Sequence, residues 1–171
     1  MAQVNISNNK YPFDWEMLRQ IICENRITEL GREPSWEARY QEFRKGVAAE
    51  WRSMGDQVKV KYLSYPVLTD TATGLKYAGP RQNPSELVVR FAPNDYPYWA
   101  TGNVTHNVLW ATRMLSDKEV EAVLESALGC PGSSLTSGDI AHERKVMWFR
   151  NPVSTQSIPE IWHIQVFHNM D

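Results

Sequence analysis

The chain has 171 residues and carries 18 Lys and Arg against 20 Asp and Glu, which gives a formal net charge of −2. This length suits one domain with a sizeable core, and 42% hydrophobic with 22% charged residues excludes a disordered chain or a coiled coil. The nearly balanced charge argues against nucleic-acid binding through a broad basic face, and the apolar stretches are too short to cross a membrane.

Two helices are predicted in the N-terminal third, after a flexible polar leader over residues 1–12. Asp14 is suited to cap a helix that ends at Gly31. Pro34 opens a second helix, which Gly55 ends. Apolar residues at three- and four-residue spacing predict that one face of this second helix packs on the core: Trp36, Tyr40, Phe43, Val47, Trp51 and Met54.

The next segment leaves two interpretations open. Val58, Val60 and Tyr62 alternate as in a strand, but Asp56 would also cap a short helix through Leu63. Residues 66–86 are rich in Thr, Gly, Pro and Asn, which predicts a long loop.

Strands dominate the second half of the chain. Ser116 and Glu119 have the spacing of a capping box, so a helix is expected from there to Leu128, with Gly129 as its end. A Gly- and Ser-rich loop follows over residues 129–138. Four strands are predicted, over residues 87–91, 104–112, 146–149 and 161–167. The fold class is therefore α+β: a single domain over residues 13–171, with N-terminal helices followed by a mainly antiparallel sheet with one inserted helix.

The sequence has neither a Gly-rich phosphate loop after a strand nor the Gly-x-Ser-x-Gly elbow of a serine nucleophile. No cofactor is expected. The two cysteines, Cys23 and Cys130, form neither a disulfide framework nor a metal-binding motif, so we expect both to be reduced thiols. The absence of a signal-peptide pattern indicates a cytoplasmic protein. A facial metal site of His106, His163 and Asp95 is an alternative that the spacing does not require, so the chemistry is predicted to be metal-independent.

Two histidines are candidates for chemistry. His106 and His163 each lie within a predicted strand beside bulky apolar residues. In the last strand His163, Gln165 and Phe167 share one face. Since histidine titrates near neutral pH, either histidine is suited to transfer a proton.

Four segments resemble a fungal family that includes the N-acetylglucosamine-induced proteins. They are the run from Asn94 to Trp99, the run from Thr105 to Trp110, the Trp-Phe-x-Asn…Gln-Ser motif within residues 146–158, and residues 163–166. The resemblance covers most of the chain from Trp15 onward. It implies a fungal source and brings no established reaction.

A more distant resemblance is to the histidine triad superfamily. The order of motifs is similar: Asn94-x-x-Pro97, a strand with His106, a helix from Ser116, Asn151, Gln156-Ser157, and a last strand with His163. The resemblance implies a histidine-triad-like fold, a phosphate held by the Asn and Gln-Ser groups, and a homodimer. One departure is that Gln165 stands where a second histidine of the alternating set would fall. The seven-residue step from Gln156 to His163 also requires a bulge or a different strand register.

Three functions follow. The first is an enzyme that isomerises, cyclises or dehydrates an organic metabolite, with His163 or His106 as general acid or base. Asp95 would orient the imidazole. Family-level association suggests a role in fungal secondary metabolism. The second is a nucleotide or sugar-phosphate hydrolase or transferase of histidine triad type. The third is a non-catalytic module that binds a metabolite. The side chains expected to contact a small-molecule substrate are Asn94, Tyr96, Tyr98, Trp110, Trp148, Asn151, Gln156, Ser157 and Gln165.

Overall fold

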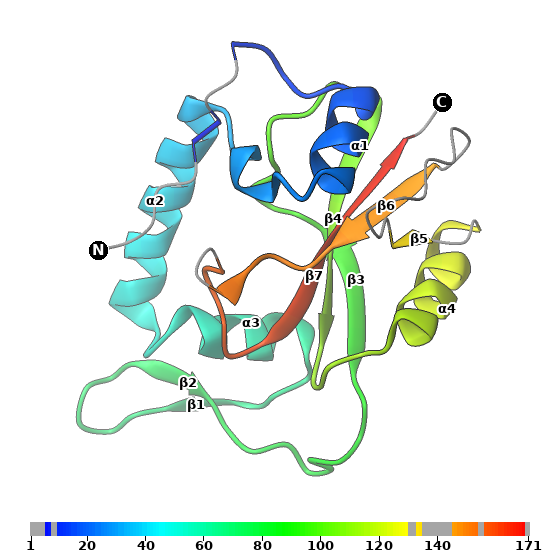
Figure 1. Cartoon of the computed structure of the whole chain (residues 1–171). Helices are drawn as coiled ribbons and strands as arrows, with labels where there is room; N and C mark the ends of the chain where they lie inside the picture. The colour runs from blue at the N-terminus through cyan, green and yellow to red at the C-terminus, as the bar shows by residue number, and fades with distance from the viewer. Residues whose placement is uncertain (1–5, 8–9, 130–132, 135–144, 154–155, 170–171) are drawn as a thin grey trace.

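A five-stranded sheet, in the order β3-β4-β7-β6-β5, forms the centre of the molecule (Figure 1). The computed structural model describes residues 6–7, 10–129, 133–134, 145–153 and 156–169. Cys130 and most of the loop predicted over residues 129–138 lie outside this range, as does part of the leader. The strands of the sheet are β3 (Val89–Pro93), β4 (Val104–Ala111), β5 (Ser133–Ser134), β6 (Val146–Phe149) and β7 (Trp162–Asn169). Neighbouring strands are antiparallel except for β5 and β6, which pair in parallel.

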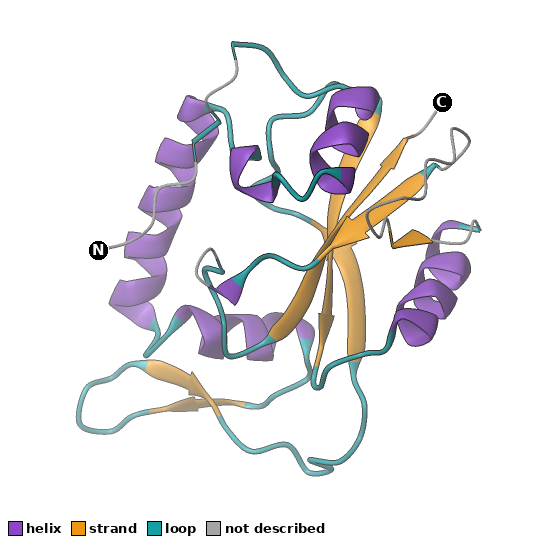
Figure 2. Cartoon of the chain, in the orientation of Figure 1, coloured by secondary structure: helices purple, strands orange, loops and turns teal. Residues whose placement is uncertain are grey.

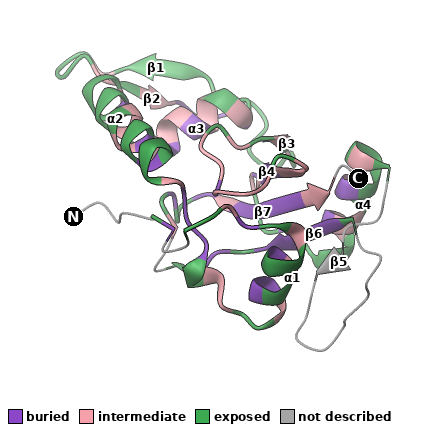
Figure 3. Ribbon diagram, turned by 90° about the horizontal axis from the view of Figure 1, so that it is seen from above, coloured by how far each residue is buried: buried purple, intermediate pink, exposed green. Residues whose placement is uncertain are grey.

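Helices pack against both faces of this sheet (Figure 2). On one face, α4 (Asp117–Leu128) buries Val120 and Leu124 against Leu109, Ile164 and their neighbours. On the other face, α1 (Trp15–Cys23) buries its apolar side against Met147, Phe149 and Phe167. Both faces of the sheet are therefore covered by helices, and Figure 3 shows that β6 and the middle of β7 are buried. The mixed α+β class is as predicted.

The signals at the ends of α1 and α4 are local and explain most of their boundaries. The Asp14 side chain accepts from the backbone N–H of Met17 at 2.8 Å and begins α1. Ser116 and Glu119 form the predicted capping box of α4, and Gly129 ends it with a φ of 69°. The first helix was predicted too long, because it ends at Cys23 and the chain then turns through Asn25 at a φ of 54°. A short 3-10 turn, η1 (Ile27–Glu29), follows, and its partly buried Ile27 packs against the same core cluster.

The second predicted helix is two helices. The first, α2 (Pro34–Glu50), stops at Trp51 because the next N–H, that of Arg52, donates to the carbonyl of Lys76 at 2.9 Å. The second, α3 (Met54–Tyr62), begins because the Ser53 hydroxyl accepts from the N–H of Asp56. Gly55 therefore does not end a helix, and the open choice over residues 58–62 resolves as helix, with Ser53 rather than Asp56 as its cap.

The predicted loop over residues 66–86 contains a β-hairpin of β1 (Val67–Thr69) and β2 (Lys76–Ala78). The Asp70 carboxylate accepts from the N–H groups of Ala72 and Thr73, and Gly74 has a φ of 74°. These residues form the turn, so the prediction of a long loop over residues 66–86 was wrong for residues 67–78. The Arg52 guanidinium, together with these backbone N–H groups, lowers the pKa of Asp70 to about 2.

None of the helices in the described part of the chain is both long and apolar enough to cross a bilayer.

Candidate active site

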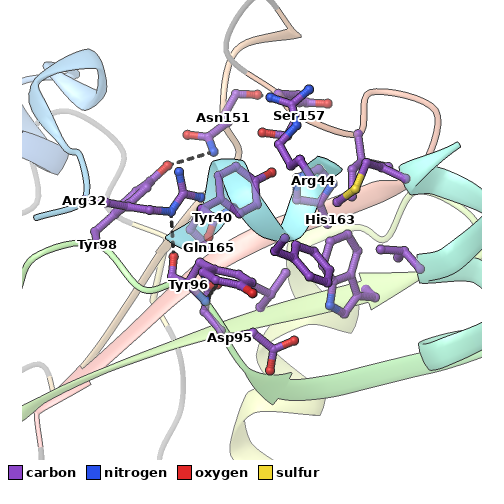
Figure 4. A pocket seen from close by; sticks show the side chains of 18 of the residues that line it. Arg32, Tyr40, Arg44, Asp95, Tyr96, Tyr98, Asn151, Ser157, His163 and Gln165 are labelled. Carbon is purple, nitrogen blue, oxygen red and sulfur yellow. Dashed lines mark hydrogen bonds between the residues drawn. The ribbon is translucent and has the colours of Figure 1, made fainter. Parts of the chain in front are cut away.

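A pocket of about 710 Å³ lies against the sheet face that also carries α1. Its walls come from α2, α3, the segment before β4, β4 and β7 themselves, and the segment between β6 and β7 (Figure 4). Aromatic rings form much of the lining: Tyr40, Phe43, Tyr62, Tyr96, Tyr98 and Trp110. The Tyr62 and Trp110 rings stack at 5.6 Å, so this wall is held in place by its own contacts.

Ten of the twelve predicted site residues line this pocket. They are Asn94, Asp95, Tyr96, Tyr98, Trp110, Asn151, Gln156, Ser157, His163 and Gln165. The other two, His106 and Trp148, do not line it. Strand alternation explains Trp148, because its side chain points to the opposite face of the sheet and packs with the cluster under α4.

His163 presents one free ring nitrogen to the pocket. Its Nδ1 lies 2.8 Å from the carbonyl oxygen of Ile161, which only accepts, so Nδ1 carries the proton. In the neutral ring Nε2 then holds a lone pair, and no residue in the described part of the chain bonds to it. Burial lowers the pKa of His163, which favours this neutral form. The Trp110 ring, 4.8 Å away between centroids, fixes the imidazole from the side.

His106 has no nitrogen left for proton transfer. The N–H of Tyr98 donates to Nδ1 at 2.9 Å, and Nε2 lies 2.8 Å from Oε1 of Gln165. Burial lowers the pKa of His106 to about 3, so the ring stays neutral. It also lies opposite Phe167 in the sheet, four residues from His163, which places the two histidines about 13 Å apart along the strands. This separation departs from the predicted shared site, because direct proton transfer needs hydrogen-bond reach or one bridging water.

Asp95 contacts neither histidine. Its carboxylate accepts from Lys61 at 2.6 Å and from the Tyr62 hydroxyl at 3.2 Å, at the exposed rim of the pocket. Asp95 therefore does not orient an imidazole as predicted; the carbonyl oxygen of Ile161 orients the imidazole of His163. Nor do His106, His163 and Asp95 form a metal site, since no group of three metal-ligating side chains occurs among the described residues.

Polar groups gather at one end of the pocket. The amide of Asn151 donates to the Tyr98 hydroxyl at 3.2 Å, and Nε2 of Gln156 donates to the Asn151 carbonyl at 2.6 Å. Oε1 of Gln156 is buried without a hydrogen-bond partner in the described part of the chain. Arg44 and Ser157 also line the pocket, and in the view of Figure 4 both are drawn on the side away from Asp95. Of these groups, the Arg44 guanidinium and the Ser157 hydroxyl can donate to an anionic or carbonyl oxygen, whereas Oε1 of Gln156 can only accept.

Sequence reasoning missed the residues that the helices contribute. Arg32, Tyr40, Arg44 and Lys61 all line the pocket, and Tyr40 was assigned only to a core face. The missed signal is that Tyr40 and Arg44 are four residues apart, so an aromatic ring and a charge share the face that was predicted to be wholly apolar. The cation of Arg44 lies 5.8 Å from the Tyr40 ring and has no carboxylate partner among the described residues.

The chain matches one protein-family model and is similar to a fungal protein and to a solved structure. The family model described as "Protein of unknown function (DUF3605)" matches residues 14–169. N-acetylglucosamine-induced protein 1 of Candida albicans is 21% identical over an alignment that covers 97% of this chain and 72% of that protein. The crystal structure of HTC1 is similar with a TM-score of 0.57 and 20% identity, covering 93% of this chain and 86% of that one. The structural likeness indicates a shared fold.

Proposed function

The chain belongs to the DUF3605 family, and from that premise we propose that it is a small-molecule enzyme in which His163 transfers a proton to or from an organic substrate held in the pocket. The reaction class is an isomerisation, cyclisation or dehydration, since each of these begins with a proton transfer and needs no redox partner. In this proposal the reaction is a tailoring step in fungal secondary metabolism.

One observation carries the proposal: the lone pair on Nε2 of His163 faces a cavity large enough for a metabolite. Donation from Nδ1 to Ile161 fixes the tautomer, and Trp110 fixes the ring plane, so the base is held ready before substrate binds. A lowered pKa keeps the imidazole in its base form at neutral pH.

A second candidate is a phosphoester hydrolase or transferase of histidine triad type. What favours it is the polar end of the pocket, where Arg44, Asn151 and Ser157 have the chemistry to hold a phosphate. Against it stands Gln165, which occupies the pocket face where that chemistry would use a second histidine and which cannot act as nucleophile or proton carrier.

The test compares wild type with His163→Asn. An asparagine nitrogen takes the place of Nδ1 and keeps the donation to Ile161, while Nε2 is lost. His168→Asn is the matched control, because His168 is a half-buried residue of the same strand that lies outside the pocket.

Binding is measured first, as the thermal shift of each variant with AMP, a sugar phosphate, phenylpyruvate and N-acetylglucosamine; the name of the Candida relative suggests the last compound. Turnover is then followed by NMR in a fungal metabolite extract. We expect turnover that His163→Asn reduces at least a hundredfold and His168→Asn leaves unchanged. Because the base form of His163 is required, kcat/KM should fall with acid at an inflection below pH 6.5.

Equal turnover in wild type and His163→Asn would overturn the proposal. Release of phosphate from AMP or the sugar phosphate, lost in His163→Asn, would select the second candidate.

A further inference from the structure

We propose that the substrate is a carbonyl compound with a hydrogen on the adjacent carbon, that Gln165 donates to its oxygen, and that His106 positions the Gln165 amide to do so. This inference rests on the proposed role of His163 as the base. It names the substrate class and adds a catalytic residue, Gln165, and a positioning residue, His106.

The orientation of the Gln165 amide follows from the tautomer of His106, which the Tyr98 N–H sets. A backbone N–H only donates, so the Tyr98 N–H at 2.9 Å makes Nδ1 of His106 an acceptor. A neutral imidazole has one N–H, which must then be on Nε2. That N–H donates to Oε1 of Gln165 at 2.8 Å, and Nδ2 of Asn94, which can only donate, lies farther from the same nitrogen, at 3.4 Å. The amide oxygen is therefore occupied on the His106 side, and the neutral state of this buried imidazole keeps the order of donors fixed.

The other end of the amide faces the pocket. Gln165 is only 7% exposed and is one of the lining residues, yet no acceptor for its Nε2 lies among the residues that the structure describes. The N–H₂ group is open to the pocket, so water or a bound molecule can accept from it. A carbonyl or hydroxyl oxygen of a bound molecule can accept from it, whereas a group that only donates, such as an N–H, would be repelled.

Gln165 and His163 are placed to act on neighbouring atoms of one molecule. They are two residues apart on the same face of β7, which separates their Cα atoms by about 7 Å, and both side chains line the pocket. A carbonyl oxygen bound to Gln165 thus brings the adjacent carbon toward Nε2 of His163.

The step balances without any co-reactant. Nε2 of His163 takes a proton from the adjacent carbon, the electrons of that C–H bond form a C=C bond, and the carbonyl π electrons move to the oxygen. The Gln165 N–H stabilises the resulting enolate oxygen, since a fixed donor stabilises charge where it develops. Return of the proton from His163 to a different carbon or oxygen completes an isomerisation.

The rest of the pocket suggests the form of the probe. Arg44 offers a positive charge without a carboxylate partner in the described part of the chain, and Tyr62 and Trp110 offer a flat apolar wall. Phenylpyruvate combines a carboxylate, an enolisable ketone and an aromatic ring. Its matched control is 3-phenylpropanoate, which lacks the ketone.

The experiment measures exchange of the methylene protons of phenylpyruvate, acetylacetone and 2-tetralone with D₂O by NMR. We expect exchange above the uncatalysed rate with at least one ketone, lost in His163→Asn. Gln165→Met, which has similar length and no donor, should reduce kcat for exchange by about a hundredfold. Wild type should bind 3-phenylpropanoate more weakly than phenylpyruvate. Gln165→Met, which has no donor for the ketone oxygen, should bind the two compounds with equal affinity.

Two variants of His106 separate positioning from folding. In His106→Gln the new amide nitrogen takes the place of Nε2 and still donates to Gln165, whereas His106→Asn accepts from Tyr98 but cannot reach Gln165. We expect His106→Asn to lower kcat about tenfold or more with KM changed far less, and His106→Gln to retain most of the rate. If both variants lose activity equally, the positioning role is overturned.

A measurement on the unaltered protein does not depend on any variant folding. Long-range ¹H–¹⁵N correlation of the full-length chain should show His106 as the Nε2–H tautomer; an Nδ1–H or charged ring overturns the orientation argument. Exchange unaffected by Gln165→Met, or absent with all three ketones, overturns the carbonyl assignment. His163-dependent turnover of a compound without a carbonyl would do the same and leave the proposed function standing.

Discussion

Two buried histidines on neighbouring strands, His106 and His163, end with opposite chemical roles. Both lie beside bulky apolar residues and both lose charge through burial. The two residues differ at Nε2. In His106 this nitrogen donates to Gln165, whereas in His163 it faces the pocket. Only the latter nitrogen can exchange a proton with a ligand.

His106 should make the protein less stable in acid. Its pKa is about 3 in the folded state against an ordinary value of 6.5, so between these pH values the unfolded chain binds the extra proton. Stability from this residue is therefore complete above pH 6.5 and falls by about 1.4 kcal/mol for each pH unit below it. Urea unfolding at pH 7 and pH 5 should show a loss about 2 kcal/mol larger for wild type than for His106→Gln. Identical losses would contradict this assignment; the comparison cancels the other titrating groups, His163 and His168 included.

Helix α4 is the element whose local signals and tertiary packing agree best. Its capping box and its glycine end are encoded within the helix itself, and its buried face meets the sheet through Val120 and Leu124. Helix α2 is the contrary case, since an apolar periodicity that continues to Met54 is interrupted where Arg52 pairs with the β1–β2 hairpin. A backbone contact distant in sequence can end a helix that periodicity alone would extend.

Removing the Leu124 side chain should destabilise the fold strongly. This residue is completely buried between α4 and the sheet, so Leu124→Ala leaves a cavity and should lower the free energy of unfolding by about 3 kcal/mol. Glu125→Ala, at the next and exposed position of the same helix, is the control and should change it by less than about 0.5 kcal/mol. Chemical denaturation measures both, and a similar effect for the two variants would show that α4 does not pack as described.

At the scale of the whole molecule, one buried ion pair connects the helical part to the pocket. Arg32 donates to Glu37 of α2 at 2.9 Å and to the carbonyl of Tyr96 at 2.9 Å, and it lies 4.1 Å from the Tyr40 ring. These contacts join α2 to the segment before β4, so two walls of the pocket are held together by one guanidinium.

Breaking this pair should therefore affect both stability and ligand binding. Glu37→Gln leaves a buried guanidinium without its counter-charge and should lower the free energy of unfolding by about 3 to 5 kcal/mol. Glu42→Gln removes an ion pair of the same helix whose side chains are 74% exposed, and should cost less than about 1 kcal/mol. Thermal and urea unfolding check both, with thermal shift by phenylpyruvate as the binding readout. Equal stabilities for the two variants would mean that Arg32 does not connect these elements.

The sequence alone determined the mixed α+β class, the caps of α1 and α4, most strands of the sheet, and ten of the residues that line the pocket. It could do so because caps, strand alternation and the Asn94 and Gln156-Ser157 motifs are local features of the chain. Only the tertiary structure decided where α2 ends, that residues 67–78 form a hairpin, and that Trp148 faces away from the pocket. It also decided which histidine has a ring nitrogen facing the pocket, because that depends on Tyr98 and Gln165, which folding brings beside His106 from 8 and 59 residues away. A side chain's chemistry is set by its partners, and partners distant in sequence exist only once the chain is folded.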